Sequence, residues 1–184
     1  DLLYILAFSN PNRTGAWAGV VGTKMSNLGL EQGVQELGYK FVRADVGDKY
    51  VSETLSKKGW LLGGETSGHI ICKDLVSTGD GTIAALKVIS SLLLLGKKPS
   101  EVLSNFTKIP QINKAITVSN KDIINDKDLK LLIKEIESDI TVGRVLVRAS
   151  GTEPKIRIMI EAPEESVAMN FVDDIENLIK SKIK

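Results

Sequence analysis

Several residue types on which common functions depend are nearly absent from this sequence. Its 184 residues include one cysteine, Cys72, and one histidine, His69. A single cysteine excludes an internal disulfide, and its place in an apolar run indicates a buried thiol rather than a nucleophile. No aspartate cluster with metal-ligand spacing occurs either, so we expect this chain itself to bind no metal ion.

Long apolar runs and an excess of charge of one sign are also missing. No apolar run approaches the roughly 20 residues that span a bilayer. The 24 basic and 23 acidic residues leave a net charge of +1, which provides no electrostatic attraction to nucleic acid or anionic membranes. We therefore expect neither as a partner. The sequence opens at Asp1 without the basic segment of a signal peptide, and we expect a cytoplasmic protein.

The clearest local signal is a glycine-rich stretch between two short apolar runs, Gly63-Gly64-Glu65-Thr66-Ser67-Gly68-His69. Its glycines permit unusual backbone conformations and a close approach to a ligand. A carboxylate and a hydroxyl on such a loop, Glu65 and Ser67, suit recognition of the hydroxyls of a sugar. The alternative is a plain hairpin turn, in which Glu65 is solvated and Ser67 caps the backbone.

A second stretch, RASGTEP at residues 148–154, connects two further apolar runs. Arginine presents a planar pair of donors to a phosphate, and the hydroxyls and the glycine amide of this stretch supply additional donors. The alternative is a surface turn whose arginines pair with Glu153 or Glu161, and such surface pairs contribute little to stability.

Together, GGETSGHIICKDLVSTGDG and RASGTEPKIRIM resemble the third and fourth domains of the α-D-phosphohexomutase superfamily, and most closely those of its bacterial phosphoglucosamine mutases. Residues 25–31 and 43–51 match further family segments, so the resemblance runs through the whole chain. Thr66 stands where that subfamily usually has glutamine. Because Thr66 lies between the presumed contacts, the difference leaves the implied site intact.

The resemblance implies which residues hold the substrate. Glu65 and Ser67 contact the sugar hydroxyls, while Gly47 and Asp48, in a second loop, help to select the sugar. The implied phosphate-binding residues are Arg148, Ser150, Gly151, Thr152 and Arg157.

Two of these assignments keep an alternative, and so does the role of His69. His69 either transfers a proton, orients Glu65 or makes one structural hydrogen bond. Asp48 either attracts the ammonium group of glucosamine or caps the next helix. Arg157 either binds phosphate or pairs with Glu161.

The implied chemistry interconverts glucosamine 6-phosphate and glucosamine 1-phosphate through a phosphoserine and a bisphosphorylated sugar, with Mg²⁺ assisting, and supplies UDP-N-acetylglucosamine for the cell wall. The phosphoserine and the Mg²⁺ ligands belong to two upstream domains. We therefore expect a C-terminal fragment, inactive alone, whose partners are a hexosamine phosphate and the missing domains. The alternatives are a phosphomannomutase or phosphoglucomutase of the same superfamily, or a non-catalytic sugar-phosphate-binding module.

The order of expected elements predicts two domains. In residues 1–107 strands alternate with helices, which predicts a layered α/β domain with a mixed sheet. Residues 108–184 follow a β-α-β-β-α order, which predicts a small α+β domain with an antiparallel sheet backed by two helices. Residues 2–8 are expected to form a strand or the start of a helix. Residues 81–95, apolar on nearly every face, are expected to form a buried helix.

Overall fold

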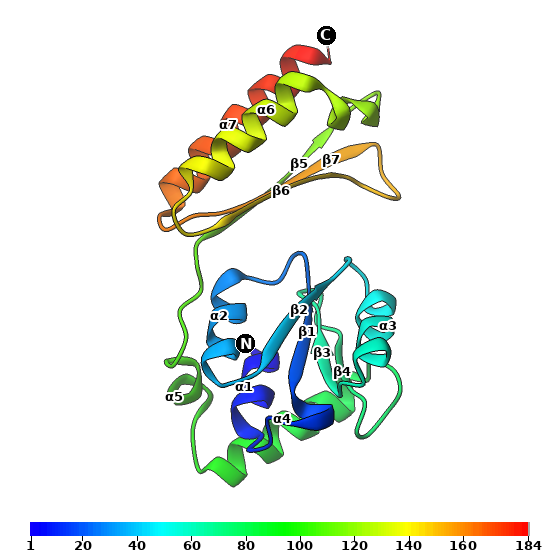
Figure 1. Cartoon of the computed structure of the whole chain (residues 1–184), viewed down its shortest axis with the longest axis vertical. Coiled ribbons are helices and arrows are strands. Elements are labelled where there is room, and N and C mark those ends of the chain that lie inside the picture. The colour runs from blue at the N-terminus through cyan, green and yellow to red at the C-terminus, as the bar shows by residue number, and fades with distance from the viewer. Residues whose placement is uncertain (184) are drawn as a thin grey trace. The chain divides into compact units, whose positions relative to one another are not determined.

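The computed structural model describes residues 1–183, and the chain divides into two units, Asp1–Lys108 and Ile109–Lys184 (Figure 1). Each unit has its own hydrophobic core. The fold is of the predicted kind, because a mixed sheet with helices is followed by an antiparallel sheet with helices.

The first unit is built on a four-stranded sheet in the order β2-β1-β3-β4. Strands β1 (Gly19–Thr23), β2 (Lys40–Ala44) and β3 (Leu62–Gly64) are parallel, and β4 (Ile70–Cys72) runs antiparallel to β3. The carboxyl ends of the three parallel strands therefore meet at one edge of the sheet. In open α/β sheets this is the edge at which ligands usually bind.

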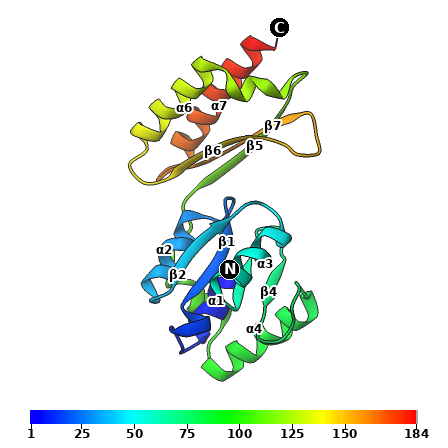
Figure 2. The ribbon, with the colours of Figure 1, turned by 45° about the vertical axis from the view of Figure 1, so that its right-hand side comes forward.

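Helices cover both faces of this sheet (Figure 2). The helical elements are α1 (Leu2–Ser9), α2 (Leu28–Glu36), α3 (Asp48–Lys58), α4 (Gly81–Leu95), α5 (Pro99–Leu103) and the short 3₁₀ helix η1 (Gly15–Trp17). Helix α3 packs against one face, where Val21 and Ile71 are buried. Helices α1, α2 and α4 share the core on the other face, where Val20 and Leu62 are buried.

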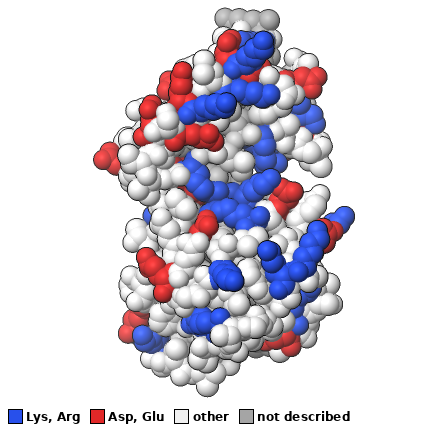
Figure 3. Space-filling model, in the orientation of Figure 1, with Lys and Arg blue, Asp and Glu red and all other residues white. Residues whose placement is uncertain are grey.

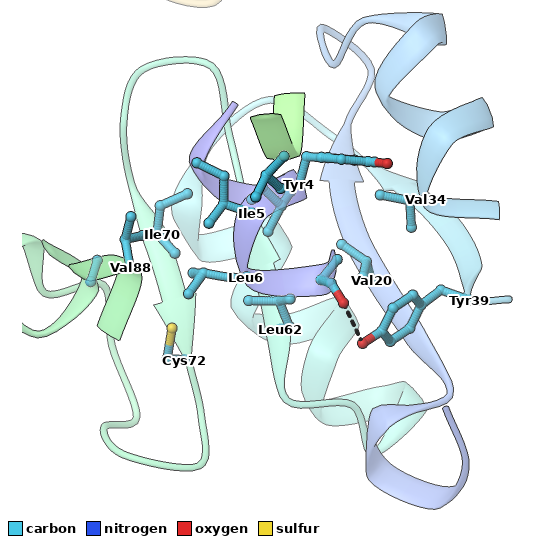
Figure 4. Close-up of a cluster of buried hydrophobic side chains, with 14 residues drawn as sticks. Tyr4, Ile5, Leu6, Val20, Val34, Tyr39, Leu62, Ile70, Cys72 and Val88 are labelled. Atoms are coloured by element: carbon cyan, nitrogen blue, oxygen red, sulfur yellow. Dashed lines mark hydrogen bonds between the residues drawn. The ribbon is translucent and has the colours of Figure 1, made fainter. Parts of the chain in front are cut away.

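Residues 2–9 form a helix, which decides between the two structures that their sequence allowed. Residues Leu3 through Ala7 of α1 are all buried. Neighbouring helices and β3 surround α1, so an apolar residue is favoured at every position rather than at alternate ones. The hydroxyl of Tyr39 donates a hydrogen bond to the Ala7 carbonyl (3.0 Å), which ties α1 to the start of β2 (Figure 4).

Helix α4 begins and ends where its sequence predicts, but its predicted burial is only half right. Asp80 caps it by accepting a hydrogen bond from the Ile83 amide (2.9 Å), and Gly96 ends it in the left-handed conformation. Ala84 and Val88 are buried in the core. The opposite side, with large apolar residues, is exposed to solvent.

The second unit is a three-stranded antiparallel sheet with two helices on one face (Figures 1 and 2). The strand order is β5-β7-β6, with β5 (Gln111–Thr117), β6 (Arg144–Ala149) and β7 (Lys155–Glu161). Helices α6 (Lys127–Asp139) and α7 (Glu165–Lys182) form a common core with Ile156, Ile158 and Ile160 of β7. A short 3₁₀ helix, η2 (Lys121–Asn125), follows β5.

Alternation along β6 and β7 decides which side chains enter that core. Arg148 of β6 and Arg157 of β7 are paired in register, and each lies between core-facing neighbours. Successive residues of a strand point to opposite faces. Both arginines therefore project from the face of the sheet that α6 and α7 leave uncovered.

Candidate functional site

The glycine-rich loop of the first unit lies at the carboxyl edge of the parallel strands. It joins β3 to β4 as a hairpin, with the Glu65 amide bonded to the His69 carbonyl (3.0 Å). Gly68 adopts a φ of +101°, a conformation that few residues other than glycine accept. The loop therefore places the side chains of Glu65, Ser67 and His69 together at this edge.

These three side chains form a closed hydrogen-bonded triangle. Ser67 Oγ donates to Glu65 Oε1 (2.7 Å), and His69 Nδ1 lies 2.9 Å from the same oxygen and 3.1 Å from Ser67 Oγ. The second oxygen, Glu65 Oε2, accepts a hydrogen bond from the Gly47 amide (3.1 Å). Glu65 is thus held from both of its oxygens before any ligand arrives.

These hydrogen bonds also shift the pKa values of Glu65 and His69. Burial alone would raise the pKa of Glu65, but the hydrogen bonds from Ser67, His69 and the Gly47 amide outweigh burial, and the pKa is lowered. The hydrogen bond to Glu65 is the main reason why the pKa of His69 is raised, and the negative charge of Asp48 adds to the effect. The loop therefore presents a firmly ionised carboxylate beside a readily protonated imidazole.

The hairpin alternative is right about the backbone and wrong about the side chains. Only 9% of the Glu65 side chain is exposed, and Ser67 bonds to the Glu65 carboxylate rather than capping the backbone. The idea that Asp48 caps the next helix is also wrong. The cap of α3 is Gly47, at φ +132°, and Asp48 is the first helical residue. The negative charge of its exposed carboxylate contributes to the raised pKa of His69.

Arg43, in the residues that carry the resemblance but not among the predicted site residues, holds this edge together. Its Nε donates to Glu31 Oε2 (2.8 Å), and its Nη1 donates to the carbonyls of Thr23 (3.1 Å) and Ser26 (2.5 Å). These contacts join the ends of β1 and β2 to helix α2. An arginine at the end of a strand does not by itself indicate such partners, so the role of Arg43 could not be predicted from sequence.

The second candidate site is the loop between β6 and β7, at residues 150–154. Ser150 is buried, and its amide donates to the Lys155 carbonyl (2.8 Å), which closes the turn. Arg148 precedes the turn, and its Nε is buried without a hydrogen-bond partner. A Cβ added at Gly151 would meet no atom of the chain within 4 Å. The loop therefore combines an unused guanidinium donor with open space above a glycine.

Arg157 pairs with Glu153, one of the two carboxylates named for the surface-turn alternative, and not with Glu161. Its Nη2 contacts Glu153 in the same loop, and Lys155 lies 2.5 Å from the other oxygen of Glu153. The hydrogen bond from Lys155 is the main cause of a lowered pKa at Glu153. Glu161 instead pairs with Arg144 (2.7 Å) and is fully buried.

One basic residue near this loop was missed by sequence reasoning. Lys121, at the start of η2, donates from Nζ to the Ser150 carbonyl (3.0 Å). It is separated from Ser150 by 29 positions in the chain, so only the tertiary fold brings it to the loop. The contact brings Lys121 to the turn in addition to Arg148, Lys155 and Arg157.

Neither loop resembles a metal centre. Within residues 1–183, no three or more His, Cys, Asp or Glu side chains are grouped so that they could hold a metal ion. In the same part of the chain, every helix is too short or too polar to cross a membrane. What the loops offer is hydrogen bonding to hydroxyls in the first unit and positive charge for an anion in the second.

The chain belongs to the phosphoglucomutase/phosphomannomutase family. Residues 1–109 match the alpha/beta/alpha domain III of that family, and residues 103–178 match its C-terminal domain. Among curated relatives, the chain is 45% identical over 181 residues to a phosphoglucosamine mutase of Polynucleobacter asymbioticus, covering 97% of this chain and 40% of the relative. A phosphoglucosamine mutase of Cellvibrio japonicus is 38% identical, covering 100% and 42%.

Solved structures show the same fold. An Aspergillus fumigatus N-acetylphosphoglucosamine mutase, in complex with GlcNAc-6P and magnesium, matches with a TM-score of 0.80 at 20% identity, over 96% of this chain and 45% of that one. A phosphoglucomutase/phosphomannomutase family protein of Burkholderia thailandensis matches with a TM-score of 0.67 at 23% identity, over 98% and 41%. The chain thus spans about 40% of the length of the curated relatives it matches.

Proposed function

We propose that this chain is the substrate-holding part of a phosphoglucosamine mutase, which interconverts glucosamine 6-phosphate and glucosamine 1-phosphate through a phosphoserine and a bisphosphorylated sugar. The names of the relatives at 45% and 38% identity support this choice of substrate within the family. The loop of the first unit binds the sugar hydroxyls, and the loop of the second unit binds a phosphate.

The observation that carries the proposal is the arrangement around Glu65. Its carboxylate is ionised, shielded from solvent and fixed by the Gly47 amide, Ser67 and His69. A carboxylate has about four acceptor sites, so at least one stays available for a sugar hydroxyl after these contacts. Because the acceptor is already oriented, binding a sugar costs little reorganisation.

The phosphate end of the substrate goes to the Ser150–Thr152 turn. Arg148 contributes the donor that has no partner in the free chain, and the hydroxyls and the Gly151 amide complete the set. Arg157 also binds the phosphate, after it releases the Glu153 carboxylate. The exchange is possible because both groups are anions that accept hydrogen bonds from a guanidinium. Glu153 therefore occupies Arg157 until the substrate arrives.

Asp48 also supports the choice of an aminosugar. Asp48 lies exposed in the first turn of α3, next to the sugar loop, where a carboxylate attracts the ammonium group of glucosamine. We assign His69 to keep Glu65 oriented and, once protonated, to return a proton to a hydroxyl. Gly47 shapes the loop from which Asp48 projects.

The remaining catalytic parts are assigned to residues outside this chain. The described residues do not fit a Mg²⁺ site, so we assign the Mg²⁺ ligands to the part of the relatives that this chain does not span. When bound elsewhere in the enzyme, Mg²⁺ neutralises charge on the transferred phosphoryl group. The phosphoserine is likewise placed in the part of the relatives that this chain does not span.

The test is a comparison of substrates with the longer enzyme that includes the preceding domains. Glucosamine 6-phosphate should give a higher kcat/KM than mannose 1-phosphate or glucose 1-phosphate. A preference for mannose or glucose phosphates would indicate a phosphomannomutase or phosphoglucomutase, and no turnover of any of them would favour a binding module. The 184-residue chain alone should bind glucosamine 6-phosphate without turning it over. Turnover by the chain alone would show that the catalytic groups are misassigned.

A further inference from the structure

Helix α4 has a second apolar stripe that the first unit leaves uncovered. Leu86, Ile89 and Leu93 follow the i, i+3, i+7 spacing that aligns side chains on one side of a helix. They are 62%, 54% and 76% exposed, and Leu94 beside them is 87% exposed. Ala84 and Val88, on the opposite side, are buried. The helix therefore has two apolar sides and only one partner within the unit.

The exposed stripe also lacks the charges that a solvent-facing helix normally carries. Lys87 is the only charged residue in Gly81–Leu95. Its Nζ contacts both oxygens of Asp74 (2.7 Å each) and lies 5.1 Å from the centre of the Trp17 ring, so it is engaged away from the stripe. Helix α4 lies at the lower edge of Figure 1, and Figure 3 has the same orientation. The lower edge of Figure 3 is white, the colour of residues other than Lys, Arg, Asp and Glu.

We propose that this stripe, formed by Leu86, Ile89, Leu93 and Leu94, is the surface on which the preceding domains of a longer polypeptide dock. The chain covers only 40–42% of the two relatives described above, and it matches a domain numbered III and a C-terminal domain. The relatives therefore contain a large additional part, and no charge on the stripe opposes permanent burial against it.

The character of the stripe favours a permanent partner over a transient one. Interfaces that form and dissociate are about as polar as the rest of a protein surface, whereas obligate interfaces resemble a divided hydrophobic core. Four large aliphatic side chains without a charged neighbour on the helix match the obligate kind. A covalently linked domain meets this requirement, because it is always present at a high effective concentration.

The experiment uses cysteine labelling. Cys72 is the only cysteine of the 184 residues and is 2% exposed, so an introduced cysteine reports alone in this chain. In the longer polypeptide, mass spectrometry of the labelled peptide identifies the introduced cysteine. In the 184-residue chain, Leu93→Cys and Leu86→Cys should react rapidly with a maleimide. In the longer polypeptide with the preceding domains, the labelling rate of both should fall by about tenfold or more, as it does for buried positions. Lys58→Cys, at the exposed end of α3 on the other face of the sheet, is the control and should react equally in both.

Two results would overturn the proposal. Equal labelling of Leu93→Cys in the short and long proteins would show that the preceding domains do not cover the stripe. Labelling that slows as the concentration of the 184-residue chain rises would assign the stripe to a second copy of the chain. Because no substrate enters this experiment, its outcome is independent of the mutase assignment.

Discussion

The amide of Gly47 donates a hydrogen bond to Glu65 Oε2 across 18 positions of the chain, at a distance of 3.1 Å. Gly47 holds φ at +132°, a conformation in which a side chain would be strained. This hydrogen bond therefore joins two loops that the sequence analysis treated as separate, at residues 46–48 and 63–69. The Glu65 carboxylate is the group that connects them.

The first prediction concerns the pKa of His69. In the 184-residue chain it should lie above the ordinary value of about 6.5, because the Glu65 carboxylate favours the protonated ring. Glu65→Gln should move it down toward that value, with Asp48 retaining part of the rise. Since His69 is the only histidine, one NMR titration measures it directly. Glu53→Gln, which alters an exposed carboxylate on α3, is the control. An unchanged pKa in Glu65→Gln would contradict the assignment.

The same contact predicts how the stability of the loop depends on pH. The folded-state pKa of Glu65 is lowered, so its contribution is lost as the pH falls through that pKa. The folded-state pKa of His69 is raised, so its contribution is lost as the pH rises through that pKa. The loop should therefore be most protected from amide exchange between the ordinary pKa values of the two groups, from about 4.3 to about 6.5, and should lose protection on either side. Protection that continues to rise above this window would argue against the pair.

The second prediction separates two arginines of the same strand. Arg148→Ala should weaken binding of glucosamine 6-phosphate roughly ten- to a hundredfold, because a charge-assisted hydrogen bond is lost. Arg148→Lys should recover only part of this, since lysine lacks the planar fork. Unfolding in urea should change little in either variant, because the lost Nε has no partner in the free chain.

Arg144→Met is the matched control for Arg148. It removes a charged partner of the fully buried Glu161 and should lower the free energy of unfolding by about 1–3 kcal/mol. The affinity of the folded protein for sugar phosphate should remain. Calorimetry for binding and urea titration for stability measure the two effects. Equal effects of both substitutions on affinity would mean that the turn is not the phosphate site.

The third prediction tests the open space above Gly151. Gly151→Ala should fold normally, because the added Cβ meets nothing and the backbone φ is not in the left-handed region. It should nevertheless weaken phosphate binding, because the methyl group occupies the space in which the phosphate approaches the amide. Gly81→Ala, at a similarly open glycine of α4, should leave binding unchanged. Full affinity in Gly151→Ala would place the phosphate elsewhere.

The fourth prediction concerns Lys121. Its hydrogen bond to the Ser150 carbonyl holds the turn and adds positive charge to it. Lys121→Met should raise the KM of the longer enzyme several-fold with a smaller effect on kcat, and Lys121→Arg should restore most of the loss. Lys127→Met, on the exposed start of α6, is the control for a simple loss of charge. A drop in thermal stability without a change in KM would reduce Lys121 to a structural contact.

Local sequence signals predict much of the fold. Asp80 and Gly96 mark the two ends of α4, and Asp126 caps α6 through the Asp128 and Leu129 amides. Such signals are reliable because capping depends on side chains within a few residues of the helix end. Alternation along β7 identifies its core face for the same reason, since the period of two is a property of the strand itself.

The tertiary structure decided what depends on residues far apart in the sequence. Residues 2–9 are apolar throughout, which suits a buried helix or a buried strand equally, and only packing among other helices selects the helix. For α4, an apolar pattern predicts that a side is hydrophobic but not that a partner is present in the same unit.

The same distinction between local and distant residues applies to the candidate sites. The sequence determined which loops carry carboxylate, hydroxyl and guanidinium groups, because these groups are neighbours in the chain. It did not determine that Gly47 fixes Glu65, that Lys121 reaches Ser150, or that Arg157 pairs with Glu153 while Glu161 goes to Arg144. Those contacts follow from strand register and from loops meeting at a sheet edge, which only the folded chain establishes.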